Sequence, residues 1–368
     1  MAVSTNVELN VLEGARNLVR YVHIEAGQEV LIHVEPQFDD PEVVGALQQA
    51  IEEVGAPVTV MRTRHWNKQT EPPPPAFEHA IEGTDVLIGQ GEYLHTKNRY
   101  IQIALFERGL IYINNEAKTA DALGSEYGRF PAELLFGIGQ RIMARLARAR
   151  QVKVTTPAGT DVTMSVDRRT VGGYCYDFRH DTPGFKKGFP GGVACFHPED
   201  PVDGVIAIET IPPGLGAPVV LLEKPLMLTL RDHRVAAMEG PGADWLRERW
   251  ATRGDGNSGW LAECMWGIHP RAMGKGGRGA ANPHLLHFGF GNAIAYGGRA
   301  FSKTWTVMFT QDATLTADGE PILERGHLTL LDDRDIRTIA SRYGDPGRWL
   351  GLLPATLAEC FGEGGTDA

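Results

Sequence analysis

Residues 259–322 contain a dense group of side chains that could do acid–base or metal chemistry. They stand within apolar sequence and are Glu263, Cys264, His269, His284 and His287. A buried carboxylate or imidazole is costly unless it is paired, hydrogen-bonded or bound to a metal. Several of them in one small sheet therefore predict a functional site. The alternative is a set of hydrogen-bonded core histidines beside a solvated edge.

Strand-like runs carry this group, and glycine-rich segments connect them. The runs are residues 259–269, 284–292 and 303–309. Side chains alternate between the two faces of a strand, so Glu263 and His269, an even number of positions apart, are expected to share a face. Cys264 is expected to point away from Glu263, and the sequence fixes no neighbouring base that would activate its thiol.

Further candidates lie outside these runs. His95 follows the third strand expected in the first half of the chain, and ligands gather at the carboxyl ends of parallel strands. His180 belongs to a long irregular stretch, residues 174–192, that could contact substrate or close over it. Tyr296 could donate a hydrogen bond to a developing oxyanion. For His95 and Tyr296 a structural role is the alternative.

Residues 1–150 alternate strands with helices. Short apolar runs typical of strands occur at residues 30–34, 58–61, 85–89 and 110–114. Residues 41–54 have helical spacing, with Pro41 at the first helical position. This alternation predicts an α/β domain with an open, doubly wound parallel sheet. Residues 1–150 contain no GxGxxG turn and no GxxxxGK[ST] loop, so we do not expect this half to bind a nucleotide.

Residues 151–368 have a different pattern, which predicts a β-rich domain of the α+β type with a helical C-terminal end. A helix at residues 131–150 is expected to lead into it. Residues 152–156 and 161–166 flank a Thr-Pro-Ala-Gly turn and predict a β-hairpin. Short strands then recur between glycines and prolines, at residues 205–208, 226–230 and 235–238.

Composition limits the partners that this chain can have. Hydrophobic residues make up 42% and charged residues 22%, as in soluble globular proteins. The net charge is −10 and the basic residues are scattered, so no nucleic-acid footprint is visible. No apolar run is long enough to span a membrane, and the absence of a signal peptide predicts the cytoplasm. We expect a small-molecule substrate.

Short motifs occur in the order of a known family. They are Asp39-Asp-Pro-Glu-Val-Val44, His95-Thr96-Lys97, Thr156-Pro-Ala-Gly-Thr-Asp161, Pro190-Gly-Gly192, Trp266-Gly-Ile-His-Pro-Arg-Ala272 and Asp318-Gly-Glu-Pro-Ile322. Over roughly residues 10–330 the chain resembles the aminopeptidase T-like metallopeptidases and their relatives, the 2,5-dihydroxypyridine 5,6-dioxygenases of nicotinic acid catabolism. The resemblance implies their fold and a homo-oligomer, a dimer or larger.

The resemblance also implies a metal site, which this chain alters. The dioxygenase branch holds iron(II) with two histidines and one carboxylate. One ligand would stand at Glu263, where the peptidase branch also uses a glutamate. The other two would be a His-x-Asp pair, at whose positions this chain has Trp305 and Val307. Neither of these side chains can coordinate a metal, and one carboxylate cannot hold iron or zinc firmly.

Three interpretations of this altered site follow. A metal, Fe(II) or zinc, could be held by a rebuilt set of Glu263, His269 and His287. Alternatively, the site works without a metal, with Glu263 as a buried general base and His95 or His269 as its partner. Trp305 would then be a stacking wall for a flat substrate. In the third interpretation only binding remains.

The favoured prediction is an enzyme without a cofactor. It opens or hydrolyses a small, flat, nitrogen-containing substrate, a heterocycle or an amide, at the cleft between the two domains. Glu263, His95 and His269 are its predicted catalytic residues. The predicted substrate-binding residues are Trp305, Trp266, His287, Tyr296 and His180. The alternatives are an iron-dependent ring-cleaving dioxygenase or a metallo-aminopeptidase with a rebuilt site, and a non-catalytic small-molecule-binding homologue.

Overall fold

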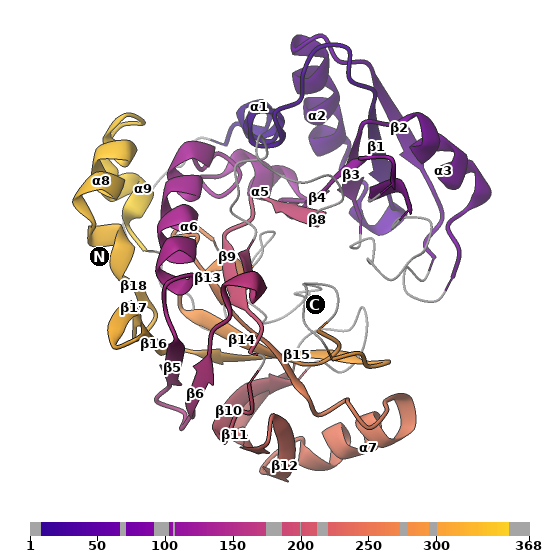
Figure 1. Ribbon diagram of the computed structural model, residues 1–368. Coiled ribbons are helices and arrows are strands. Elements are labelled where there is room, and N and C mark those ends of the chain that lie inside the picture. Colours follow the sequence, from indigo (N-terminus) through magenta and orange to yellow (C-terminus); the bar gives the residue numbers. More distant parts are fainter. Residues whose placement is uncertain are drawn as a thin grey trace. The chain divides into compact units, whose positions relative to one another are not determined.

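The computed structural model describes residues 9–66, 71–91, 103–105, 107–173, 186–198, 200–211, 220–272, 279–293 and 300–352 (Figure 1). The chain forms two compact units. The described residues of 1–132 and 176–191 make the first unit, and those of 133–175 and 192–368 make the second. This division differs from the predicted boundary near residue 150.

The first unit is built on a parallel sheet, as the sequence predicts. Its strands in spatial order are β2 (Val58–Arg62), β1 (Val30–Val34), β3 (Val86–Gln90), β4 (Ile111–Asn115) and β8 (Lys186–Phe189). All neighbouring strands run parallel. β2 lies on one side of β1 and β3 on the other, so the winding reverses at β1. This is the doubly wound arrangement.

Helices flank this sheet (Figure 1). They are α1 (Val11–Val22), α2 (Pro41–Glu53), α3 (Pro75–Ala80) and α5 (Ala120–Gly124), with the short 3-10 helices η1 (Pro36–Phe38) and η2 (Ile81–Gly83). α2 begins where the sequence predicts, because Asp40 accepts hydrogen bonds from the amides of Glu42 and Val43 and Pro41 takes the first helical position. β1 and β3 are buried along their whole length, which explains their continuous apolar sequence.

His33 lies within buried β1. Its side chain is 2% exposed, and its Nε2 atom is 2.7 Å from Thr63 Oγ1. The ring also packs against Phe77, with 4.4 Å between ring centroids. The histidine is therefore a hydrogen-bonded core residue.

Two segments explain why the boundary differs from the predicted one. β8 follows the predicted first domain in the sequence but pairs with β4 and so completes the parallel sheet. Helix α6 (Ala132–Leu146) lies almost entirely in the second unit. A Cβ atom at Gly137 in this helix would be 3.0 Å from Ile339 Cδ1, so the helix packs closely against the C-terminal region of the chain.

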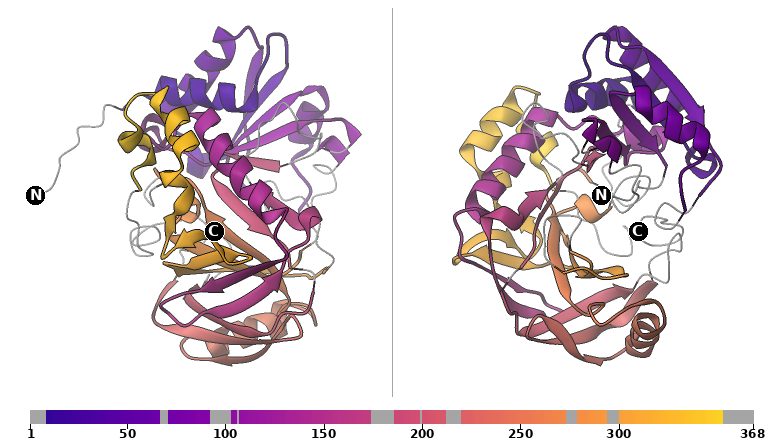
Figure 2. Two further views of the ribbon diagram at one scale, coloured as in Figure 1. Left: turned by 60° about the vertical axis from the view of Figure 1, so that its left-hand side comes forward. Right: turned by 45° about the vertical axis from the view of Figure 1, so that its right-hand side comes forward.

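The second unit contains two antiparallel sheets, seen from two more sides in Figure 2. The larger has the order β12 (Arg234–Glu239), β11 (Val220–Arg231), β10 (Gly204–Ile211), β6 (Asp161–Ser165), β5 (Gln151–Thr155), β16 (Thr314–Ala317), β17 (Glu320–Glu324) and β18 (His327–Leu328). The smaller has the order β15 (Trp305–Gln311), β14 (Leu285–Gly291), β13 (Leu261–Gly267), β9 (Val193–Phe196) and β7 (Val171–Gly173). The β-rich second domain is thus confirmed.

Helices of this unit are α6, α7 (Ala243–Arg253), α8 (Arg334–Ser341) and α9 (Pro346–Leu350), with the 3-10 helices η3 (Arg168–Thr170), η5 (Gly279–Ala281) and η7 (Thr329–Asp332). In neither unit is any described helix both long and apolar enough to cross a membrane.

The smaller sheet is buried on both faces, and aromatic residues cover one of them. β13 and β14 are buried at every position. Trp250 of α7 packs against Phe290, with 6.0 Å between ring centroids, and donates a hydrogen bond to Thr306 Oγ1. On the same face Trp266 meets Phe196 edge-on. The opposite face carries Glu263.

Asp255 anchors the start of β15. Its carboxylate accepts hydrogen bonds from the amide of Lys303 (2.7 Å), the hydroxyl of Ser302 (2.8 Å) and the amide of Asn257 (2.9 Å). The bond from the Lys303 amide is the main cause that holds the pKa of Asp255 below its ordinary value of 3.8. These bonds therefore favour the charged carboxylate.

We expect Asp255→Asn to lower the free energy of unfolding by roughly 1 kcal/mol near neutral pH, because the bonds to a charged acceptor are weakened. A carboxylate whose pKa is lower in the folded state stabilises the fold above its unfolded-state pKa. That stabilisation is lost as the pH falls through the folded-state pKa. Urea unfolding of both proteins at stepwise lower pH should show the difference shrinking below about pH 4. A difference independent of pH would contradict this role.

Candidate functional site

Glu263 owes its direction to a β-bulge. Leu261 of β13 pairs with Phe290 of β14, but Glu263 pairs with Gly289, so Ala262 is an extra residue in β13. In a regular ladder Glu263 would pair with Phe288 and lie on the opposite face of β14. Bulges of this kind re-aim side chains and are common beside active sites.

Gly289 gives the Glu263 side chain its space. A Cβ atom at position 289 would lie 2.5 Å from Glu263 Cγ and 2.6 Å from its Oε1. The carboxylate therefore lies directly against the backbone of β14. Any residue other than glycine at this position would displace it.

Glu263 and His287 form a buried pair on this face. Oε1 of the glutamate is 3.6 Å from Nε2 of the histidine, and the two residues are 1% and 4% exposed. Glu263 Oε1 has no hydrogen-bond partner among the described residues. The Phe309 ring meets the imidazole edge-on, with 5.1 Å between centroids, and Val307 stands opposite Gly289. The Glu263–His287 pair thus lies next to the apolar side chains of Phe309 and Val307.

The two predicted pocket tryptophans lie on opposite faces of the sheet. Trp305 alternates with Val307 and Phe309 along β15, so it shares the face of Glu263, and it is partly exposed. Trp266 is an odd number of positions from Glu263 in a regular part of β13. It therefore points to the other face, where it packs against Phe196 with 6.4 Å between centroids. The prediction that Trp266 lines the same pocket as Glu263 is not supported.

His269 lies beyond the end of β13, so strand alternation does not fix its direction. Its ring Nδ1 accepts a hydrogen bond from the Arg271 amide (3.2 Å). Its own amide bonds to the carbonyl of Ala281 (2.9 Å). A Cβ atom at Gly192 would lie 2.5 Å from the Cβ of His269. The argument that Glu263 and His269 share a face therefore fails, because the strand ends at Gly267.

The described residues do not fit the metal centre that the family resemblance implies. That centre needs two histidines and a carboxylate. Within the described ranges no three His, Cys, Asp or Glu side chains are grouped so that they could hold a metal ion. The rebuilt set of Glu263, His269 and His287 is thus not such a group. On the neighbouring strand β15, the residues opposite Gly289 and His287 are Val307 and Phe309, whose side chains offer no ligand atom.

Cys264 is not a nucleophile in this arrangement. It lies on the face opposite Glu263 and is fully buried. Burial, helped by the negative charge of Glu263, raises the pKa of its thiol far above the ordinary value of 9.0. The thiolate that nucleophilic chemistry requires is therefore disfavoured.

Other predicted residues cannot be placed. His95, His180 and Tyr296 lie outside the described residues, so their roles stay predictions. The irregular stretch 174–192 is described only from residue 186 onward.

The sequence reasoning missed the roles of Gly289 and Phe309. A signal for the first exists, because a lone glycine inside a strand marks a bulge or a close approach of another group. Phe309 gives no such signal, since its contact with His287 depends on the register of β14 and β15.

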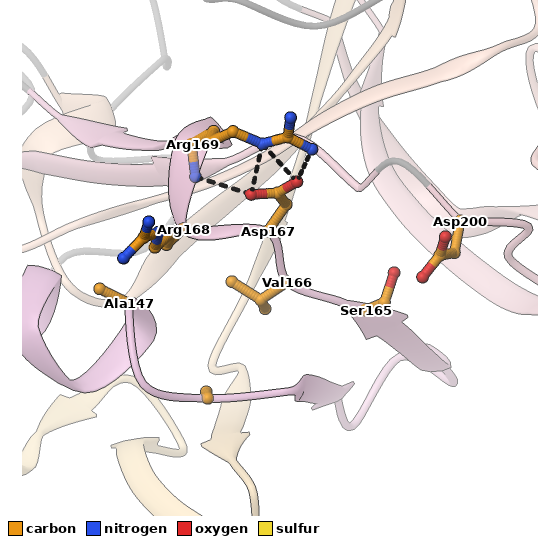
Figure 3. Close-up of a pocket in the computed structure, with 8 residues that line it drawn as sticks. Ala147, Ser165, Val166, Asp167, Arg168, Arg169 and Asp200 are labelled. Atoms are coloured by element: carbon orange, nitrogen blue, oxygen red, sulfur yellow. Dashed lines mark hydrogen bonds and ion pairs between the residues drawn. The ribbon is translucent and has the colours of Figure 1, made fainter.

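A separate cavity of about 370 Å³ lies elsewhere in the second unit (Figure 3). Its lining residues are Ala147, Ala149, Ser165, Val166, Asp167, Arg168, Arg169 and Asp200. The Arg169 guanidinium donates to the carboxylate of Asp167, with 2.8 Å from Nε to Oδ2. None of the predicted site residues that the structure describes lines this cavity.

The fold is that of the aminopeptidase T-like proteins, as predicted. The structure of 2,5-dihydroxypyridine dioxygenase from Pseudomonas putida KT2440 matches with a TM-score of 0.63 and 17% identity, over 86% of this chain and 96% of that one. AmpT from Thermus thermophilus matches with a TM-score of 0.60 and 15% identity, over 86% of this chain and 98% of that one. At identities this low, the two structural matches establish the shared fold and nothing further.

Residues 132–277 match the family model of 2,5-dihydroxypyridine 5,6-dioxygenase. The matched stretch contains Glu263 but ends before His287 and Trp305. No curated protein matches the sequence. The resemblance predicted from the short motifs is thus confirmed, and the match to this family model supports an enzyme.

Gly289→Ala tests whether glycine is required beneath Glu263. We expect it to lower the free energy of unfolding by about 1–3 kcal/mol, because the added methyl overpacks the site. Gly256→Ala is the control, since a Cβ atom there has no neighbour within 4 Å. Combining Gly289→Ala with Glu263→Ala should recover part of the loss in a urea-unfolding cycle. Additive losses would show that the two side chains do not compete for this space.

Proposed function

We propose that this chain is an enzyme that opens or hydrolyses a small, flat, nitrogen-containing substrate, with Glu263 as general base and without a metal. The buried Glu263–His287 pair is the observation that carries the proposal. A buried carboxylate oxygen without a hydrogen-bond donor is destabilising. Such a cost is accounted for if a substrate or water donates to that oxygen during the reaction.

The proposed reaction adds water across a carbon–nitrogen bond. Glu263 takes a proton from a water molecule, and the hydroxide oxygen bonds to the electrophilic carbon of an amide or ring carbonyl. The carbon–nitrogen bond then breaks, and its electron pair stays on the nitrogen, which takes up the proton that Glu263 accepted. His287 would hold the glutamate and exchange protons with it. This sequence consumes one water and needs no oxidant.

Trp305 supports a flat substrate. It lies on the face of Glu263 and is partly exposed, and an indole offers a stacking surface to a heteroaromatic ring. The family model takes its name from a dihydroxypyridine, which is such a ring. The other proposed substrate contacts are His95, His180, His269 and Tyr296. We also propose that the protein is a homo-oligomer and that it is cytoplasmic.

A metalloenzyme of the parent type is the second candidate. The match to the 2,5-dihydroxypyridine 5,6-dioxygenase family favours a dioxygenase of this type. The likeness to AmpT adds a metallo-aminopeptidase as a second form of this candidate. The side chains of Trp305, Val307 and Phe309 are evidence against it, because none of them is a metal ligand and no third ligand for Glu263 and His287 is grouped with them among the described residues.

Glu263→Gln keeps the shape of the side chain and removes its basicity. Against a panel of hydroxypyridines and cyclic amides, we expect turnover to fall by about 10²–10⁴-fold with an unchanged fold. Glu320→Gln, at an exposed position of β17, is the matched control and should keep full activity. A Glu263→Gln protein as active as the parent would rule Glu263 out as the base.

Metal analysis separates the two candidates. Protein purified without chelator should carry iron or zinc well below one equivalent, and a chelator should leave its turnover unchanged. The double variant Trp305→His, Val307→Asp restores the family's ligand pattern, so it should bind zinc more tightly than the parent in a calorimetric titration. Near-stoichiometric metal, with activity lost to a chelator and restored by metal, would establish the metalloenzyme instead.

A further inference from the structure

Two buried histidines bind the residues of the bulge in β13. Nε2 of His233 is 2.8 Å from the carbonyl oxygen of Leu261. Nδ1 of His197 is 2.7 Å from the carbonyl oxygen of Ala262. Both histidines are 1% exposed. Ala262 is the extra residue of the bulge and Leu261 is the last paired residue before it, so both come directly before Glu263.

His197 takes the place of a missing strand partner. β9 pairs with β13 only from Cys264 to Gly267 and ends at Phe196. His197 is the next residue, and its side chain reaches the Ala262 carbonyl that β9 no longer covers. The extra residue of a bulge leaves the regular ladder, and a buried carbonyl needs a donor from elsewhere.

His233 binds Leu261 through both its backbone and its ring. The Leu261 amide donates to the His233 carbonyl (3.0 Å), while the Leu261 carbonyl accepts from the His233 ring. The other ring nitrogen, Nδ1, is 2.7 Å from the carbonyl of Asp200. The imidazole also stacks on Trp260, with 4.3 Å between centroids. Because a carbonyl oxygen can only accept, the bond to Leu261 requires a proton on Nε2 of His233.

We infer that His197 and His233 are positioning residues that hold the bulge in β13 and so direct Glu263 onto Gly289 and toward His287. The inference rests on the proposed function in taking Glu263 as the base. Without these donors the Leu261 and Ala262 carbonyls would be buried and unpaired. The bulge would then lose its advantage over the regular register, which places Glu263 opposite Phe288.

Asparagine and glutamine variants separate this role from general stability. The asparagine amide nitrogen overlays Nδ1 of a histidine, and the glutamine amide nitrogen overlays Nε2. His197→Asn and His233→Gln therefore keep the bonds to Ala262 and Leu261. His197→Gln and His233→Asn lose them, and His233→Asn still keeps the bond to Asp200. Each pair of variants removes the same ring and differs in which carbonyl can be bound.

The readout is the ¹³C resonance of the Glu263 side-chain carboxyl in protein labelled at glutamate, assigned by its absence in Glu263→Gln. We expect His197→Asn and His233→Gln to keep its chemical shift close to that of the parent, and His197→Gln and His233→Asn to move it. With a substrate in hand, the latter two should lower kcat by about tenfold or more and change KM little, since misplacement of a catalytic group affects the chemical step.

Identical behaviour of the asparagine and glutamine variants at both positions would overturn the inference. A test without substitutions covers the case in which a variant fails to fold. In the parent protein, ¹⁵N spectra of the histidine rings should show a proton on Nδ1 of His197 and on Nε2 of His233, and absence of either overturns it. Full activity of Glu263→Gln would refute the proposed function but leave these spectra unchanged, so the two failures are distinguishable.

Discussion

The close approach of the Glu263 carboxylate to the backbone of β14 is the constraint on which the site depends. It requires glycine at position 289, one extra residue in β13, and hydrogen-bond donors for the carbonyls of that bulge. Each requirement is local, yet together they draw on both sheets of the second unit, because His197 follows β9 and His233 connects β11 to β12.

Much of the fold could be predicted from the sequence, for a physical reason that particular elements show. β1 was expected at residues 30–34 and is found there, since a strand covered on both faces is apolar throughout. Pro41 and Asp40 fixed the start of α2. β8 gave no such signal, because Lys186–Phe189 is short and polar and joins its sheet only through a distant pairing with β4.

The candidate site was predictable only in part. Glu263 and His287 stood out because polar groups are rare in apolar strands. Their contact depends on the register between β13 and β14, and the extra residue Ala262 changes that register. Sequence periodicity does not reveal where such an extra residue stands. His269 was misplaced because alternation was extended beyond Gly267, where the strand ends. Trp266 stands three positions from Glu263, so alternation itself places it on the other face. This chain shares its fold with two solved structures at 15–17% identity, because the fold depends on the pattern of buried apolar residues. The chemistry depends on a few side chains, which can change without altering the core.

The return of the chain to the parallel sheet at β8 has a consequence for biosynthesis. The first unit cannot complete its sheet until residues 186–189 have left the ribosome, by which time the hairpin of β5 and β6 has already been made. Until then β4 forms an edge with unpaired amides and carbonyls, which are a template for association with other chains. The nascent polypeptide therefore spends part of its synthesis with an open sheet, and a truncation product that stops near residue 150 keeps that edge permanently.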